Sequence, residues 1–396
     1  MKYHYDDSQS FTPIGNTNWR NTNKLFGIKP KDRLQHIYAI GKTGVGKSTL
    51  LLNMAIDDIK KGHGIALIDP HGDIAETILQ YVPKERLQEV IYFNAANSEQ
   101  LPAFNPFFNV PVDQRHLVAS EIVVTFKKIW IDSWGPRLEY ILRFAILTLL
   151  EYPGATLLDI QPLLLDQAFR NLVLHYTDNL AILSFWHNEF DKYPASLKAE
   201  AVMPILNKAG VFGSSQTLRG IVGQKDGIVI ESIINNGYIF ICNLSKGLIG
   251  EQESQILGSL ITTGIQLAAM RRASIVEHLR TPFYVYIDEA HSFLSTSFAT
   301  MLSEVRKYGI GLFLTHQYLD QLPEEVRSAV LGNVGTIITF RLGTADAKVM
   351  AEEFYPVFTV DDFINLPKHC IYLKLLIDGS ASKPFSAKTN PISKCL

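Results

Sequence analysis

The sequence has 396 residues, of which 47% are apolar and 19% charged, and its formal net charge is −2. Such a composition is typical of a globular enzyme with a large core, in two domains or in one with a large insertion, and it excludes a globally basic nucleic-acid binder. Three cysteines without C-x-x-C spacing argue for a reducing compartment and against a zinc site, and neither a signal peptide nor a membrane-spanning run is predicted.

Residues 1–35 are polar and turn-rich, and we expect them to form a lead-in with one or two short strands at most. From His36 the pattern alternates, with strands expected at 36–40, 64–69 and 90–93 and helices at 47–61 and 73–81. Continuous apolar strands between helices are typical of a parallel sheet that is covered on both faces.

The first strand runs into Gly41-Lys-Thr-Gly-Val-Gly-Lys-Ser48, the G-x-x-x-x-G-K-S pattern of a phosphate-binding P-loop. Its glycines let successive backbone N–H groups face one anion, Lys47 can reach the β- and γ-phosphates, and the Ser48 hydroxyl can bind Mg²⁺. The alternative, a chance glycine-rich turn, is disfavoured by the strand before the motif and the helix after it. The residues predicted to bind the nucleoside triphosphate are Gly41, Lys42, Thr43, Gly44, Val45, Gly46, Lys47, Ser48 and Thr49.

The second strand ends in Asp69-Pro-His-Gly-Asp73, a turn-forming run at the same edge of the predicted sheet. Asp69 can join the outer shell of a metal ion. A metal site from His71 and Asp73 is conceivable, but a turn with a helix cap at Asp73 is the favoured interpretation.

Strand signals vanish between about Val112 and Ala209, where apolar residues recur at helical spacing. The helices expected there span 117–131, 137–151, 158–174, 180–190 and 196–209. We therefore predict an α/β fold, a doubly wound and mostly parallel sheet over 36–110 and 230–396, interrupted by an all-α insertion domain at 111–229. In residues 230–396 we expect strands at 238–243, 283–288, 311–315, 336–340 and around 370–377. Helices are expected between them at 251–273, 298–308, 323–331 and 345–354.

Two carboxylates end the apolar strand Phe283-Tyr-Val-Tyr-Ile-Asp-Glu289, where a parallel sheet binds its ligands. Asp288 suits the Mg²⁺ shell, together with Ser48, and Glu289 is placed to polarise the attacking water as general base. An ordinary strand end with an acidic helix cap is the alternative.

Polar residues also end the following strand, in Thr315-His-Gln317. We select Gln317 as the side chain that contacts the γ-phosphate or the water, and His316, which would point the opposite way, as structural. A cap on the next helix is the other interpretation of Gln317.

Arg306 and Arg341 are candidate arginine fingers, which act on the γ-phosphate of a neighbouring subunit. Arg306 can equally complement a helix dipole, and both can be surface cations. In the helical region, candidate DNA contacts are the basic residues and neighbouring tryptophans Lys127, Lys128, Lys192, Lys198, Lys208, Arg219, Trp130 and Trp134, although a solvated face and core packing are the more common roles of such residues.

Together these residues resemble the HerA/FtsK superfamily of P-loop ATPases, and within it the TraG/TraD-like type IV coupling proteins and their soluble relatives. The resemblance rests on seven stretches, at 40–49, 66–73, 104–107, 241–250, 285–289, 303–309 and 315–317. It implies that the α/β core is a RecA-like motor domain and that the chain forms a homo-hexameric ring with ATP and Mg²⁺ between subunits and DNA in the centre. It also gives catalytic roles to Lys47, Glu289, Gln317 and Arg306, with Ser48 and Asp288 as metal ligands.

We therefore expect a cytoplasmic ATPase, peripheral at the inner face of the cell membrane, that pumps DNA in conjugation or type IV secretion beside a relaxase or secretion components. Coupling proteins carry N-terminal transmembrane helices, so membrane docking would run through a partner or an anchor that this sequence lacks. The alternatives are a HerA-like translocase acting with a nuclease in repair or anti-phage defence, and a secretion ATPase acting on protein substrates. A GTP-driven switch is disfavoured because no Asn-Lys-x-Asp-like guanine signature occurs.

Overall fold

The computed structural model describes residues 11–18, 22–294 and 297–392. The chain divides into two compact units. The sheet unit comprises Met1–Phe93, Glu231–Leu244 and Ala268–Leu396, and the helical unit comprises Asn94–Ile230 and Ser245–Leu267.

In its described residues, the sheet unit contains an 11-stranded sheet with the order β2-β1-β13-β10-β9-β3-β8-β7-β4-β6-β5. Its strands are β1 Thr12–Thr17, β2 Leu25–Ile28, β3 Ile37–Ile40, β4 Gly64–Asp69, β5 Val90–Asn94, β6 Ile239–Asn243, β7 Phe283–Ile287, β8 Ile310–His316, β9 Thr336–Thr339, β10 Cys370–Lys374 and β13 Phe385–Thr389. The pairs from β9 through β3, β8, β7 and β4 to β6 are all parallel. The predicted α/β fold with a mostly parallel sheet is confirmed.

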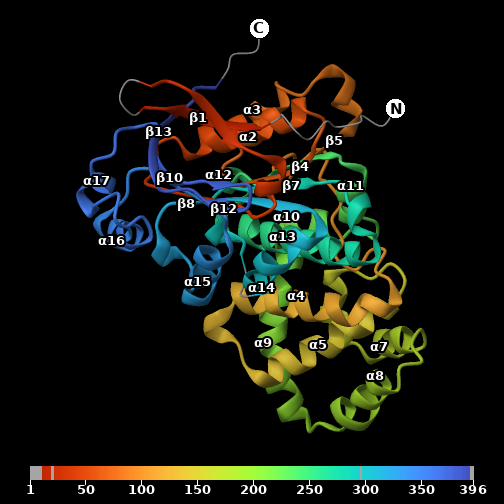
Figure 1. The fold of residues 1–396 in the computed structure, drawn as a ribbon. Helices are drawn as coiled ribbons and strands as arrows, with labels where there is room; N and C mark the ends of the chain where they lie inside the picture. The colour runs from red at the N-terminus through yellow and green to blue at the C-terminus, as the bar shows by residue number, and fades with distance from the viewer. Residues whose placement is uncertain (1–10, 19–21, 295–296, 393–396) are drawn as a thin grey trace. The chain divides into compact units, whose positions relative to one another are not determined.

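Helices cover the sheet on both faces because its central strands are apolar on both sides; every residue of β3, β4, β7 and β8 is buried. In Figure 1, α2 and α3 lie on one side of the strands and α14 and α15 on the other. The helices of this unit are α1 Pro30–Arg33, α2 Lys47–Lys60, α3 Asp73–Leu79, α11 Ile230–Asn236, α14 Ser297–Glu304, α15 Glu324–Asn333, α16 Thr344–Glu353 and α17 Val360–Ile364.

Along each strand the side chains alternate between the two faces of the sheet, and those on one face pack against α2. Ala39, Leu67 and Tyr286 from three different strands pack into one core with Leu51 and Met54 of α2. The residues next to them in each strand point to the opposite face, as the period of two requires. Removing a large apolar side chain from this core costs about 2–5 kcal/mol, so it fixes the strand ends that carry the site.

Strands from the beginning and the end of the sheet unit pair near one edge of the sheet. β1 pairs with β13, and β13 with β10, in antiparallel fashion. The prediction of a single last strand at 370–377 is wrong, because β10 ends at Lys374, a short hairpin of β11 (Leu376–Ile377) and β12 (Ser380–Ala381) follows, and β13 returns. The polar sequence Phe385-Ser-Ala-Lys-Thr389 lacks the apolar run by which the buried strands are identified.

The described part of the helical unit contains helices and no strand between residues 95 and 229. Its helices are α4 Arg115–Ile129, α5 Pro136–Glu151, α6 Ile160–Leu165, α7 Gln167–Leu174, α8 Leu180–Ser184, α9 Ala195–Ser214, α10 Gln216–Val222, α12 Lys246–Ile249 and α13 Glu251–Arg271, the last of which runs on into the range of the sheet unit.

The core of the helical unit is aromatic. Phe144 of α5 stacks on Phe185, with 4.2 Å between ring centroids, and the buried Trp186 donates to the Thr148 hydroxyl at 2.8 Å. The helix expected over 158–174 is broken into two because Asp166 caps α7 through the N–H groups of residues 168 and 169. Among the described residues, no helix combines the length and the apolar character that crossing a bilayer requires.

Candidate nucleotide-binding site

The carboxyl ends of β3, β8, β7 and β4 lie side by side in the sheet, so the loops that follow them meet at one edge. A cavity of about 410 Å³ opens there. Its lining is Thr43, Gly44, Gly46, Lys47, Ser48, Thr49, His71, Asp288, Glu289, Gln317, Lys368 and His369. Most of the residues predicted from the sequence are thus brought together.

Glycine is required in the P-loop for two different reasons. Gly44 and Gly46 have φ angles of 75° and 121°, which L side chains rarely adopt. Gly41 leaves no room for a side chain, since a Cβ there would lie 2.6 Å from the Cβ of Phe340. The loop thereby turns sharply into α2, whose N-terminal N–H groups favour an anion.

Lys47, the first residue of α2, is buried with 6% exposure. Its ammonium donates to the carbonyls of Gly41 at 2.6 Å and Lys42 at 3.1 Å. An ammonium has three protons, so one remains for a ligand in the cavity that Lys47 lines. Burial lowers the pKa of Lys47, and the nearby carboxylates of Asp288 and Glu289 oppose that shift.

The predicted metal ligands are neighbours. The Ser48 hydroxyl donates to Oδ2 of Asp288 at 3.3 Å, and the buried Thr315 hydroxyl donates to Oδ1 of the same carboxylate. Burial raises the pKa of Asp288, an effect that the bond from Thr315 opposes. A hydroxyl and a carboxylate oxygen are ligands that Mg²⁺ prefers.

Glu289 and Gln317 form a hydrogen-bonded chain with the P-loop. The Gln317 amide donates to Oε1 of Glu289 at 2.6 Å and accepts from the Thr43 hydroxyl at 3.2 Å. On its other side, Glu289 Oε2 lies 3.7 Å from Nδ1 of His291. Glu289 is only 7% exposed and has a φ of 50°, so its carboxylate is held in one place just after the carboxyl end of β7.

Asp69 caps the start of α3. Its buried carboxylate accepts from the N–H groups of His71 at 2.8 Å and of Ile74 and Ala75 at 2.9 Å. The predicted cap at Asp73 is therefore wrong, because Asp73 is the first residue of α3 and Gly72 stands at the cap position. In the described residues, no cluster of three or more His, Cys, Asp or Glu residues is arranged to hold a metal ion.

His316 points away from the cavity, into the fold, as the alternation along β8 predicts. It is 1% exposed and its ring meets that of Tyr38 edge to face, with 5.8 Å between centroids. Burial lowers the pKa of His316 to about 3, with smaller contributions from His291 and Lys47. The imidazole is therefore neutral at physiological pH.

The two candidate arginine fingers lie at opposite edges of the sheet. Arg341 follows β9, and its carbonyl accepts from the N–H of Lys42 at 2.9 Å, beside the P-loop of its own chain. Arg306 lies in the turn before β8, at the amino-terminal edge, and its side chain is exposed. The seven residues of β8 separate Arg306 from Gln317 by about 20 Å, so it cannot reach the site of its own chain.

Three residues of the site were not identified from the sequence. Thr315 holds Asp288 and accepts from the N–H of Glu289 at 3.2 Å. Lys368 and His369 reach the cavity from the loop before β10. A hydroxyl within an apolar strand was a usable signal for Thr315, whereas the antiparallel direction of β10, which brings its first residues to this edge, has no signature in the sequence.

The residues predicted to contact DNA in the helical unit differ in how exposed they are. Lys208 and Trp130 are structural, since Lys208 is 6% exposed and donates to the Ser133 carbonyl at 3.1 Å, and Trp130 packs edge to face on Phe126. Burial lowers the pKa of Lys128 to about 7. The residues Lys192 and Arg219 are exposed, and Lys198 is half-buried beside Asp191 at 3.6 Å.

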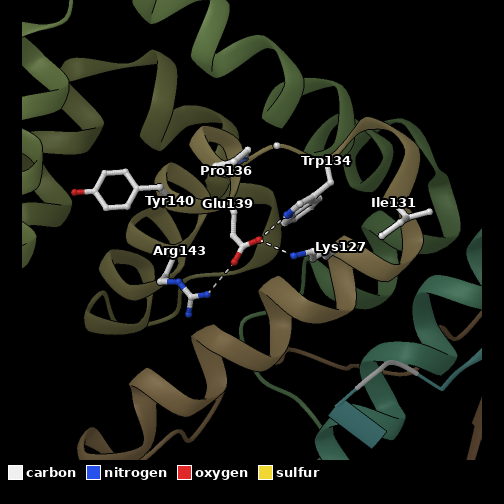
Figure 2. A pocket seen from close by; sticks show the side chains of 8 residues that line it. Lys127, Ile131, Trp134, Pro136, Glu139, Tyr140 and Arg143 are labelled. Atoms are coloured by element: carbon white, nitrogen blue, oxygen red, sulfur yellow. Dashed lines mark hydrogen bonds and ion pairs between the residues drawn. The ribbon is translucent and has the colours of Figure 1, made fainter. Parts of the chain in front are cut away.

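Lys127 and Trp134 line a cavity of about 480 Å³ in the helical unit (Figure 2). Figure 2 shows Glu139 at its centre, where the carboxylate accepts from Trp134 Nε1 at 2.8 Å and pairs with Lys127 at 3.3 Å and Arg143 at 3.4 Å. The bond from Trp134, with help from Lys127 and Arg143, lowers the pKa of Glu139. Two cations therefore share one anion, and a net positive charge lies beside an indole ring.

No family model and no curated protein matches this sequence. Solved structures match its fold. The plasmid coupling protein TrwB in complex with ADP and Mg²⁺ superimposes with a TM-score of 0.68 at 15% identity, covering 98% of this chain and 97% of that one. An unbound form of this bacterial conjugative coupling protein gives 0.67 at 16% identity over 92% and 86%. VirB4 of Thermoanaerobacter pseudethanolicus gives 0.66 at 13% identity over 96% of each chain. The chain has the fold of these proteins along nearly its whole length.

Proposed function

We propose that this chain is an ATPase whose active site is the cavity at the P-loop. The observation that carries the proposal is the chain of hydrogen bonds from Thr43 through Gln317 to Glu289, which joins the P-loop to a buried carboxylate. A phosphate-binding loop alone indicates a nucleotide, whereas a carboxylate fixed beside it supplies a base for water.

The residues of the site fit Mg-ATP. The P-loop N–H groups, the N-terminus of α2 and Lys47 suit the phosphates, and Ser48 with Asp288 suits Mg²⁺. When bound, Mg²⁺ would supply positive charge against the phosphate oxygens. TrwB, which shares this fold, has been solved with ADP and Mg²⁺ and with a non-hydrolysable ATP analogue.

Glu289 and Gln317 have different roles in the proposed hydrolysis. Glu289 accepts a proton from water, and Gln317 holds the Glu289 carboxylate in the orientation that this transfer needs. Because the same Gln317 amide accepts from Thr43 at 3.2 Å, a movement of the P-loop alters the bond that orients the base. Gln317 can therefore report the state of the nucleotide to β8 and the segment after it.

We further propose that the active form is a homo-hexamer in which Arg306 acts on the nucleotide of a neighbouring subunit. Arg306 is exposed, makes no side-chain hydrogen bond or ion pair within the described residues, and lies about 20 Å from its own site. A cation in that position can contribute to hydrolysis only from another copy of the chain.

The test of this assignment is a mixing experiment. Lys47→Ala subunits lack a working P-loop but keep Arg306, and Arg306→Ala subunits lack the finger but keep the P-loop. Each variant alone should be inactive and their mixture should regain ATPase activity. Full activity of Arg306→Ala alone, or no regain in mixtures shown to co-assemble, would rule out the finger.

The substrate that we propose is DNA, moved by a motor of the type IV coupling kind. The support is the fold shared with the coupling protein TrwB and the aromatic, net positive cavity at Lys127 and Trp134. ATPase rates with and without single-stranded or duplex DNA test it, and stimulation by either form is expected. Absence of both stimulation and binding at low salt would leave the protein-substrate alternative.

A further inference from the structure

The order of the strands gives the site a direction. Glu289 and Gln317, which mark the γ-phosphate end, come from β7 and β8 on one side of β3. Lys368 and His369 come from the loop before β10, on the other side of β3, beyond β9. A nucleotide whose γ-phosphate faces Glu289 therefore directs its nucleoside toward His369.

The backbone of His369 is fixed by its conformation and by hydrogen bonds on both sides. Its φ of 64° is a left-handed conformation, which costs a non-glycine residue free energy and is favoured only at fixed positions. Its N–H donates to the Val45 carbonyl at 2.9 Å, and its carbonyl accepts from the Thr389 N–H at 2.9 Å and hydroxyl at 3.2 Å. The residue is thus tied to the P-loop on one side and to β13 on the other.

The imidazole of His369 lies directly on the P-loop. A Cβ on Gly46 would be 2.7 Å from its Nδ1, so the ring is packed against the backbone two residues before Ser48. The side chain is half-buried, lines the cavity and makes no hydrogen bond within the described residues. Neither core packing nor a polar network explains a ring in this place.

We infer that His369 is the base platform of the nucleotide site, on whose ring the purine of the bound nucleotide stacks. Aromatic rings, including imidazole, stack with bases because both present a flat π face. The exposed Lys368 beside it adds a cation on the same side of the cavity. This inference rests on the proposed nucleotide-binding function and adds to it the residue that recognises the nucleoside.

Two substitutions remove the ring while suiting the left-handed backbone, namely His369→Asn and His369→Gly. Binding of ATP and of inorganic tripolyphosphate, which has no nucleoside, is measured for each by calorimetry. We expect ATP to bind about 5-fold to 100-fold more weakly to both variants, the range that loss of one stacking contact gives. Tripolyphosphate should bind as it does to the unaltered chain.

Other results would overturn the inference. Equal weakening of both ligands would mean that His369 only shapes the P-loop, and unchanged ATP affinity would mean that the ring contacts nothing. Lys47→Ala serves as the control, because it should weaken both ligands. If the unaltered chain binds neither ligand, the proposed function itself is wrong, and the platform with it.

Discussion

Replacing Glu289 by Gln tests the catalytic assignment with the smallest possible change. The two side chains have the same shape, so Gln can still accept the bond from Gln317 that Glu289 accepts at 2.6 Å, and its backbone can keep the φ of 50°. The amide cannot take a proton from water. The substitution therefore removes the base and leaves the packing of the site intact.

The size of the effect follows from that role. General base catalysis contributes about 10²-fold to 10⁴-fold, or about 3–5.5 kcal/mol in the activation free energy. We expect Glu289→Gln to lower kcat by this factor and to leave ATP affinity within a few-fold, since Lys47 and the P-loop are untouched.

Phosphate release under saturating Mg-ATP measures kcat, and calorimetry with a non-hydrolysable analogue measures affinity. The matched control is Glu85→Gln, which removes an exposed carboxylate at the opposite, amino-terminal edge of the sheet, where the neighbouring Arg86 donates to the His63 and Gly237 carbonyls just before β4 and β6. If Glu289→Gln retained kcat within about 3-fold of the unaltered chain, another group would have to activate the water, and our interpretation of the Gln317–Glu289 contact would be refuted.

Three further predictions concern stability and DNA. Asp69→Ala should lower the free energy of unfolding by about 1–3 kcal/mol in urea titration, because three N–H groups lose their acceptor; no change would contradict the cap. Burial lowers the pKa of His36 to about 4 and of His316 to about 3, whereas an unfolded histidine has a pKa near 6.5. Below pH 6.5 the unfolded chain therefore binds more protons than the folded chain. The free energy of unfolding should fall as the pH drops, by up to about 1.4 kcal/mol per pH unit for each histidine. His36→Asn should reduce this dependence on pH, and a free energy of unfolding that does not change between pH 4 and 6.5 would contradict the prediction. Lys127→Ala should weaken single-stranded DNA binding and reduce the salt slope by about 0.7, whereas the exposed Lys84→Ala should not; equal effects of both would place the contact elsewhere.

The parallel core could be predicted from the sequence because burial on both faces leaves long apolar runs. Gly64–Asp69 was predicted with the bounds that β4 has, and β3, β7 and β8 within a residue at each end. The topology of such a sheet then predicts that the polar residues at the strand ends lie together, and Ser48, Asp288, Glu289 and Gln317 do line one cavity.

Elements whose stability comes from tertiary contacts could not be predicted in this way. β13 is a polar strand that exists because β1 and β10 flank it, and its antiparallel neighbour β10 carries His369 to the site. The role of Asp69 was also hidden, because a carboxylate before a turn can face a metal ion or a helix end. The bonds from the three N–H groups to Asp69 become visible only in the folded chain.

The central claim is that this P-loop hydrolyses Mg-ATP, and Lys47→Ala tests it most directly. Lys47 is the side chain that the β- and γ-phosphates require, and it donates to the carbonyls of Gly41 and Lys42, which lie after the end of β3. We predict Mg²⁺-dependent phosphate release by the unaltered chain and none by a folded Lys47→Ala variant. Equal rates in the two proteins, or no turnover and no ATP binding by the unaltered chain, would contradict the claim.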